Sequence, residues 1–470
     1  MGEICMAENN VVSAQHDLIG NVSSVDTGHT NHPDAQWFSE AGLGLFLHWG
    51  LSSVEGKVDL SWGMMKNTPW DWFHLNFNKQ CPAEYYAQAD RFDPEAYDPD
   101  LWIAAAANAG VKYAVLTTKH HEGYALWPSK YGNLSTRTHM HGRDLLRPYV
   151  EACRRHGIKV GFYYSPPDWN YCREYRSWSF RPWRIDSDPI TQECIDLGLV
   201  YGDATPLNDK WEPCAIKQAD EAFIRGLYEY IRGQVTELLT QYGKIDLIWF
   251  DGRPDLLLYD ENGEPQFPIT KEEIRQLQPS IVINPRLHGV GDYLPPECEF
   301  PKEKPQCWWE RCDIWNVGSW GYTSNEAYKP LDWMLELLAK QRAWEGNLLI
   351  NCAPRPDGRM PETYYRRMEE LAQWMKYGKE AVFDVEGNLW PEICSVPATQ
   401  RGNVWYLFLT EEQVCAVVRG EKKTPKSVTV LHDGSEAAYH IGPNGDVIFT
   451  IGLHQQTEKL VVLRVEWEEE

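Results

Sequence analysis

Residues 246–252 read Asp246-Leu247-Ile248-Trp249-Phe250-Asp251-Gly252, a short apolar run that ends on a carboxylate and a glycine. A run of this length between polar segments is typical of a buried strand in a parallel sheet. Similar runs, each followed by polar residues, occur at 43–47, 113–117, 159–163, 280–283 and 347–350. We therefore expect the chain to fold around a set of parallel strands.

Helical segments separate these runs. Apolar residues recur at helical spacing in segments 100–109, 142–156, 219–242 and 331–344. Strands that alternate with amphipathic helices predict an α/β fold with a (β/α) TIM-like barrel. After about residue 377, strand-like alternation between turn residues occurs at 404–409, 414–418, 427–431, 446–451 and 459–465. That pattern predicts a C-terminal antiparallel β-sandwich domain.

The chain length of 470 residues favours two cores rather than one. We expect a partly disordered N-terminal tail at 1–33, a catalytic barrel at 34–376 and the sandwich at 377–470. The segment 170–213 is long, aromatic and irregular, which predicts an insertion at the rim of the barrel.

The composition limits the classes of partner and the cellular compartment that we expect for this protein. Lys and Arg total 45 against 68 Asp and Glu, a net charge of −23 that argues against nucleic acid or an anionic membrane surface. The 12 cysteines lack the spacing of a zinc site or a disulfide framework, as expected in a reducing compartment. No signal peptide is visible, so we expect a cytoplasmic protein, with secretion as the alternative if the start was trimmed. The sequence leaves the formation of a homo-oligomer open.

Polar residues follow every apolar run of the predicted barrel, where the chemistry of barrel enzymes lies. They are His48; Lys119, His120 and His121; Tyr164; Asp251; Asn284 and Arg286; and Asn351. A single residue of this kind is more often structural, but the agreement of six strand ends predicts a polar pocket for a small, hydroxyl-rich ligand. The 22 Trp and 24 Tyr would supply rings that stack on a sugar.

Two carboxylates are required if this pocket cleaves glycosidic bonds. Asp251 is the predicted nucleophile, and its structural alternative is to cap a helix or orient His120. Glu297, Glu299 and Glu310 are the candidates for the second carboxylate. Glu297 lies in a loop with Gly and Pro, and Glu310 follows two tryptophans at an expected strand end.

Five motifs resemble those of the α-L-fucosidase family, glycoside hydrolase family 29, between about residues 37 and 361. They are GLFLHWG at 44–50, KHHEGY at 119–124, YYS at 163–165, IWFDG at 248–252 and NLLINCAPRPDG at 347–358. The resemblance implies that Asp251 is the nucleophile and that Glu297 is the acid/base. It also implies that the fucosyl ring is held by His48, Trp62, His120, His121, Tyr164 and Arg286. No metal or organic cofactor is expected.

Three departures from the family pattern are visible. Pro296 precedes the acid/base candidate where Ala or a similar residue is usual, Glu122 stands in place of Asp, and Ser61 stands where some members carry a Glu that contacts sugar hydroxyls. An apolar wall for the sugar methyl group is expected from Trp249, Phe46 or the aromatic insertion.

The expected reaction is a double displacement with retention, in which a small carbohydrate, an α-L-fucoside, loses its terminal fucose. The two carboxyl groups should then lie roughly 5 Å apart, whereas about 6.5 to 9.5 Å would indicate inversion.

Three alternatives remain open at this point. An α-L-galactosidase of the same fold would differ by one hydroxyl group on its substrate. A metal-dependent barrel hydrolase is a second alternative, since three His and an Asp suit zinc. Against it, adjacent His120 and His121 should point to opposite sides of an extended chain. A sugar-binding module without catalysis is the third, although such a module should lack Asp251.

Overall fold

The computed structural model describes residues 28–64, 80, 82–175, 208–211, 214–215, 217–410, 412–420, 424–452, 455 and 460–468. Most of the predicted tail at 1–33 and most of the predicted insertion at 170–213 lie outside these residues. Among the helices within them, none is both long and apolar enough to cross a membrane.

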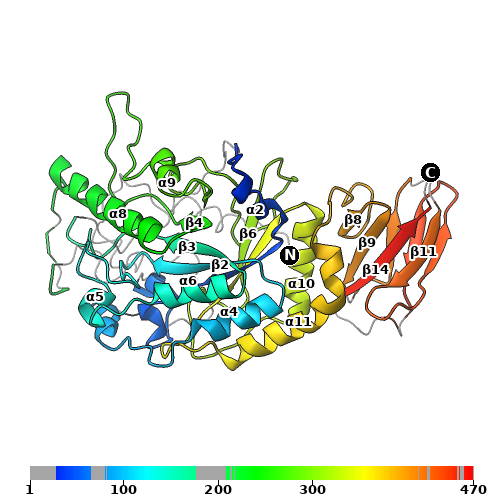
Figure 1. Ribbon diagram of the computed structural model, residues 1–470, viewed down its shortest axis with the longest axis horizontal. Coiled ribbons are helices and arrows are strands. Elements are labelled where there is room, and N and C mark those ends of the chain that lie inside the picture. The colour runs from blue at the N-terminus through cyan, green and yellow to red at the C-terminus, as the bar shows by residue number, and fades with distance from the viewer. Residues whose placement is uncertain are drawn as a thin grey trace, which may run out of the picture.

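A seven-stranded parallel sheet forms the centre of the larger domain (Figure 1). Its strands, in order across the sheet, are β5 (Val282–Ile283), β4 (Leu247–Phe250), β3 (Lys159–Tyr164), β2 (Tyr113–Lys119), β1 (Leu43–Leu47), β7 (Asn347–Cys352) and β6 (Glu310–Ile314). Every strand residue except Lys159 is buried, as expected for a parallel sheet covered on both faces. Bridges from Leu294 to Trp309 and from Glu297 to Cys312 attach the segment after β5 to β6. The predicted α/β fold with a TIM-like barrel is confirmed.

Helices cover the outside of this sheet. Four of them match the predicted segments within a few residues: α4 (Pro99–Asn108), α6 (Leu146–Arg155), α8 (Glu221–Gln241) and α10 (Leu331–Ala343). The Asp220 side chain begins α8 by accepting a hydrogen bond from the backbone N–H of Phe223 at 2.8 Å. Several helices were not predicted, among them the longer α9 (Lys271–Leu277) and α11 (Glu362–Val382) and the 3-10 helix η3 (Leu60–Met64).

The predicted C-terminal β-sandwich is also present. One antiparallel sheet contains β11 (Pro425–Val430), β14 (Leu460–Trp467), β9 (Val404–Thr410) and β8 (Ala398–Arg401), and the other contains β10 (Cys415–Val418), β13 (Val447–Thr450) and β12 (Ala438–Ile441). A separate hydrophobic core that includes Leu389 lies between them. The predicted boundary at residue 377 falls inside α11, which lies with α10 beside the sandwich (Figure 1).

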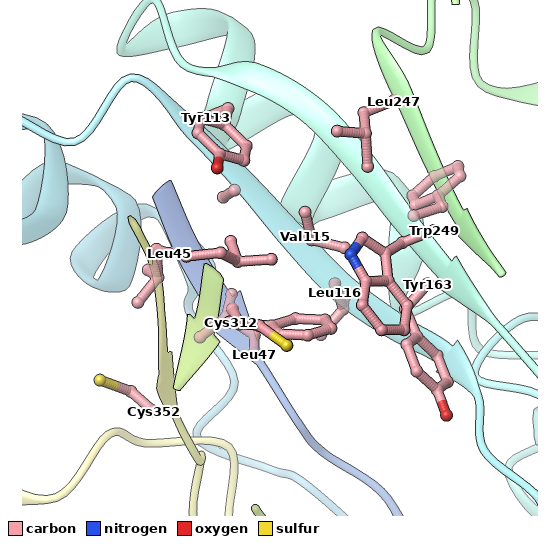
Figure 2. Close-up of a cluster of buried hydrophobic side chains, with 14 of the residues drawn as sticks. Leu45, Leu47, Tyr113, Val115, Leu116, Tyr163, Leu247, Trp249, Cys312 and Cys352 are labelled. Atoms are coloured by element: carbon pink, nitrogen blue, oxygen red, sulfur yellow. The ribbon is translucent and has the colours of Figure 1, made fainter. Parts of the chain in front are cut away.

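Large aromatic side chains fill the interior of the barrel beneath the strand ends. Figure 2 shows Tyr113, Tyr163, Trp249 and Cys312 in one buried cluster. Tyr163 on β3 pairs in register with Trp249 on β4, so their side chains lie on the same face of the sheet. The two rings stack with their centroids 5.7 Å apart. Tyr163, Trp249 and Cys312 of this cluster also line the cavity described below.

Candidate active site

Asp251 occupies the first position after β4. Its backbone N–H donates to the carbonyl oxygen of Tyr164 at 3.1 Å, which continues the pairing of β4 with β3 and fixes the position of the carboxylate. Gly252 follows with a φ of 93°, a left-handed conformation that a glycine adopts without strain. The glycine therefore lets the chain turn directly after the carboxylate.

Two side chains donate hydrogen bonds to this carboxylate. Nη1 of Arg286 donates to Oδ1 at 2.7 Å, and the hydroxyl of Tyr163 donates to Oδ2 at 2.6 Å. Burial by itself would raise the pKa of Asp251, but the Arg286 guanidinium, with smaller contributions from the His121 ring and the Tyr163 hydroxyl, lowers it to about 2. The side chain is consequently ionised at neutral pH, as a nucleophile must be.

Glu297 is the second carboxylate of the site. Nη2 of Arg286 donates to its Oε2 at 2.6 Å, so one guanidinium holds both Glu297 and Asp251. Burial raises the pKa of Glu297, and the charge of Asp251 adds to this effect, while Arg286 opposes it. The pKa values of the two groups are therefore displaced in opposite directions, which suits one carboxylate that attacks and one carboxylic acid that donates a proton.

The other two acid/base candidates lie outside the pocket. Glu299 is partly exposed and does not line the cavity described below. Glu310 was expected at the end of a strand, and this expectation is wrong because Glu310 is the first residue of β6. Its side chain is fully buried below the cavity and accepts hydrogen bonds from Tyr113 and Trp249.

A cavity of about 340 Å³, including the space at its mouth, opens above the two carboxylates. Its lining combines polar and aromatic side chains: Phe46, His48, Leu60, Trp62, His120, Tyr163, Trp249, Asp251, Arg286, Glu297, Cys312 and Trp320. The structure thus brings together most of the predicted site residues.

Tyr164 does not belong to this lining. Its hydroxyl donates to Oε1 of Gln234 on α8 at 2.9 Å, on the outer side of the sheet. Tyr163 lines the cavity instead, because successive residues of a strand point to opposite faces. The expectation that Tyr164 holds the ligand does not agree with this geometry, and of the two tyrosines it is Tyr163 that lines the cavity. The register with Trp249 is the signal that identifies the inward residue.

His48 presents a hydrogen-bond acceptor to the cavity. Nδ2 of Asn351 donates to the carbonyl oxygen of Trp320 at 2.8 Å, which leaves Oδ1 of Asn351 to accept from Nδ1 of His48 at 2.7 Å. Burial, together with the neighbouring His120, lowers the pKa of His48 to about 3. The imidazole is neutral, and its Nε2 is free to accept a hydrogen bond from a ligand hydroxyl.

His121 is held in the same way. Ser165 donates its hydroxyl proton to the carbonyl oxygen of Pro167 at 2.8 Å, so it accepts from Nδ1 of His121 at 2.6 Å. Burial lowers the pKa of His121 well below its usual value. Nε2 lies 3.5 Å from Oδ2 of Asp251 and has no hydrogen-bond partner among the described residues. Nε2 therefore faces the Asp251 carboxylate, and His121 lies beside the cavity rather than in its lining.

His120 and Trp62 complete the polar side of the pocket. Nδ1 of His120 lies 2.9 Å from the hydroxyl oxygen of Ser61. Ser61 therefore contacts a pocket histidine. The Trp62 ring packs edge-on against His121 with centroids 5.1 Å apart. Both η3 residues thus support the histidines.

The expectation that His120 and His121 point to opposite sides is wrong. One ring nitrogen of each lies with an oxygen of Asp251 in a group whose atoms are all within 4.8 Å of one another. The chain leaves β2 at Lys119 and turns, with the Gly123 N–H donating to the His120 carbonyl oxygen, so strand alternation no longer applies. These residues are a possible metal-ligand set among the described residues. The fit is poor, because both oxygens of Asp251 already accept hydrogen bonds and Arg286 carries a positive charge 2.7 Å away.

Comparison with known proteins finds relatives that match most of the chain. The family model described as "Alpha-L-fucosidase" matches residues 7–380. Tissue alpha-L-fucosidase of Bos taurus is 26% identical over 454 residues, which cover 88% of this chain and 84% of that protein. Tissue alpha-L-fucosidase of Mus musculus is 26% identical over 75% of this chain and 72% of its own length.

Solved structures share the architecture. Alpha-L-fucosidase isoenzyme 1 from Paenibacillus thiaminolyticus superposes with a TM-score of 0.69 at 26% identity and covers 93% of this chain and 99% of its own. A family 29 alpha-L-fucosidase from Bacteroides thetaiotaomicron, trapped as a covalent intermediate with 2-fluoro-fucosyl fluoride, gives a TM-score of 0.69 at 22% identity, covering 95% of this chain and 100% of its own. At that identity the second similarity supports the fold alone.

Proposed function

Because this chain belongs to the alpha-L-fucosidase family, whose model spans most of its length, we propose that it releases terminal α-L-fucose by a double displacement at Asp251. The chain is a glycoside hydrolase of that family. The proposed mechanism depends on two carboxyl groups that are bound by the same guanidinium, that of Arg286. The pKa of Asp251 is lowered, which keeps it ionised, and the pKa of Glu297 is raised, which favours its protonated form.

In the first step, ionised Asp251 attacks the anomeric carbon of the sugar and forms an ester bond. The bond between that carbon and the leaving oxygen breaks, and Glu297 gives its proton to that oxygen. Arg286 and Tyr163 hold the attacking carboxylate in a single orientation through one hydrogen bond to each oxygen. A fixed nucleophile lowers the entropic cost of reaching the transition state.

In the second step, Glu297 is a carboxylate and takes a proton from water. The oxygen of that water attacks the anomeric carbon, the ester bond to Asp251 breaks, and fucose leaves with its original anomeric configuration. The trapped intermediate of the Bacteroides thetaiotaomicron neighbour is in line with this route, since its name describes a covalent intermediate with a fluorinated fucosyl donor.

The pocket offers different chemistry to the two sides of a deoxy sugar. Nε2 of His48, which lines the cavity, is an acceptor for a hydroxyl group, as argued above. Phe46, Leu60 and Trp320 provide apolar surface that suits a methyl group at C5. A hydroxymethyl group in the same place would leave its hydroxyl without a partner there, which favours a fucoside over an α-L-galactoside.

An aryl α-L-fucoside tests the proposal. The purified protein is expected to hydrolyse it faster than the corresponding α-L-galactoside. Asp251→Gly is expected to lower kcat by on the order of 10³-fold or more. Azide added to this variant should restore turnover and give a β-fucosyl azide, because azide enters from the side that Asp251 vacates. Full activity of the variant, or an α-configured azide product, would contradict the mechanism.

A further inference from the structure

A second buried carboxyl group lies below the active site and is not used in the reaction steps. Glu310 begins β6, and Cys312, two residues further along, lines the cavity. Residues two apart on a strand share a face, so Glu310 points into the barrel one layer below Cys312. This interior is normally filled by apolar side chains, and a fully buried carboxyl group among them calls for a physical reason.

Glu310 accepts hydrogen bonds from two aromatic residues. The Tyr113 hydroxyl lies 2.5 Å from its Oε2, and Nε1 of Trp249 lies 3.1 Å from its Oε1. Tyr113 and Trp249 belong to the buried cluster of Figure 2. An indole N–H can only donate, so a buried tryptophan requires an acceptor in one fixed direction. Glu310 therefore sets the direction in which the Trp249 ring lies.

The Trp249 ring contacts two residues that hold the catalytic groups. The Arg286 guanidinium lies over the ring, 4.4 Å from its centroid, and the Tyr163 ring stacks on it. Arg286 and Tyr163 are the two residues that donate to Asp251, and Arg286 also holds Glu297. Rotation of the indole would displace both supports at once.

We propose that Glu310 is a positioning residue for the reaction, which fixes the plane of Trp249 so that Arg286 and Tyr163 hold the two carboxylates in place. This role rests on the proposed function of Asp251 and Glu297. Glu310 is placed to contact neither substrate nor the reacting atoms, because it is fully buried and does not line the cavity, whereas Trp249 and Cys312 do.

The hydrogen bond to Trp249 survives a change of charge on Glu310. Burial raises the pKa of Glu310 to about 7, against the opposing effect of the hydrogen bonds from Tyr113 and Trp249. When Glu310 is ionised, both its oxygens accept. When it is protonated, Oε2 donates its proton to the Tyr113 oxygen and Oε1 still accepts from Trp249. Oε1 of Glu310 therefore accepts from Trp249 in either protonation state. We expect a glutamine at this position to keep that hydrogen bond.

Three substitutions separate positioning from general stability. Glu310→Met keeps the volume but removes the acceptor, and Glu310→Gln keeps an acceptor oxygen. Tyr113→Phe removes the hydrogen bond from Tyr113 and leaves the one from Trp249 in place. Each is compared with the wild type in hydrolysis of an aryl α-L-fucoside and in thermal unfolding. Tyr113→Phe is the matched control, because it also deletes one buried hydrogen bond but leaves Trp249 anchored.

Glu310→Met is expected to lower kcat by about 10- to 100-fold, since a displacement near 1 Å at a reacting group costs this much. Its KM should change less than about 3-fold, because the histidines that bind the sugar are untouched. Glu310→Gln and Tyr113→Phe should keep kcat within about 3-fold of wild type. Glu310→Met and Tyr113→Phe should both unfold at a lower temperature, so lost stability alone cannot produce the loss of kcat.

Wild-type kcat in folded Glu310→Met overturns the inference, and so does an equal loss in Glu310→Gln or in Tyr113→Phe. If Glu310→Met does not fold, Trp249→Phe replaces it, because it keeps a ring and deletes the indole N–H. Wild-type kcat in that variant also overturns the inference. A wild-type protein that does not hydrolyse the fucoside overturns the proposed function and this role with it, whereas an active wild type with an unaffected Glu310→Met variant overturns this role alone.

Discussion

Arg286 is the residue on which the ionisation of the site depends. Its two terminal nitrogens bind different carboxylates, a geometry that a planar guanidinium provides and a lysine ammonium does not. It lies buried on Trp249, where the low polarity of the surroundings strengthens both ion pairs. The sequence predicted that Arg286 belongs to the site, but its bonds to two acids became visible only once the loop carrying Glu297 was placed.

Substitution of Arg286 by lysine should therefore affect rate and pH dependence together. Arg286→Lys is expected to lower kcat/KM by about 10- to 100-fold, because one of the two carboxylates loses its support. Arg286 lowers the pKa of Asp251, so a weaker contact raises this pKa and moves the acid limb of the kcat/KM profile to higher pH. A profile with an unchanged acid limb would show that Asp251 does not depend on Arg286.

His48 makes a separate prediction about stability. Its pKa is about 3 in the folded protein and about 6.5 in an unfolded chain. Between these values the unfolded chain binds a proton that the folded protein does not, so the free energy of unfolding rises with pH by up to ~1.4 kcal/mol per unit.

Urea unfolding between about pH 4 and pH 6 is expected to show a smaller slope for His48→Gln than for wild type. His440→Gln, at an exposed position on β12, is the matched control and should keep the wild-type slope. Identical slopes in all three proteins would refute the assigned neutral state of His48.

At the scale of elements, β6 and β3 explain what the sequence did not reveal. β6 reads Glu-Arg-Cys-Asp-Ile, and three charged residues in five conceal a buried strand from any search for apolar runs. Its charges are satisfied inside the fold, since Arg311 donates to Asp313 at 3.0 Å. On β3 the apolar run was recognised, but the choice between Tyr163 and Tyr164 required the pairing partner on β4.

Two loops that form the pocket wall are joined by Asp59, just before η3. Its Oδ1 accepts from the Ser319 hydroxyl and the Trp320 N–H, each at 2.9 Å. Asp59→Ala is expected to raise KM by on the order of 10-fold with a smaller change in kcat, because Trp62 and Trp320 lose their common support. Asp59→Asn, which keeps an acceptor oxygen, should remain near wild type. An unchanged KM in Asp59→Ala would show that the loops hold their positions independently.

At the scale of the whole molecule, a barrel followed by a sandwich was predicted because the apolar period changes along the chain. Its domain boundary was harder to place, since α11 continues through residue 377 as an unbroken helix. The end of α11 is tied to the sandwich: the Thr399 hydroxyl donates to the carbonyl oxygen of Ala381 at 2.7 Å, and Arg401 donates to that of Phe383 at 2.8 Å.

A chain truncated after residue 388 tests this junction. It keeps the parallel sheet and α11 but exposes the surfaces of α10 and α11 that contact β8 and β9. We expect poor solubility and a lower unfolding temperature than in the full chain, because newly exposed apolar surface favours aggregation. A soluble fragment with wild-type activity and unfolding temperature would show that the sandwich is dispensable for the barrel.

The central claim is that Asp251 forms the covalent bond to the sugar. A 2-deoxy-2-fluoro-α-L-fucosyl donor with a good leaving group slows the second step more than the formation of the ester, so the intermediate should accumulate. Peptide mapping by mass spectrometry is then expected to find one fluorofucosyl group, attached to the peptide that contains Asp251. A label on any other residue, or an active enzyme that turns this donor over without ever carrying a label, would contradict the account.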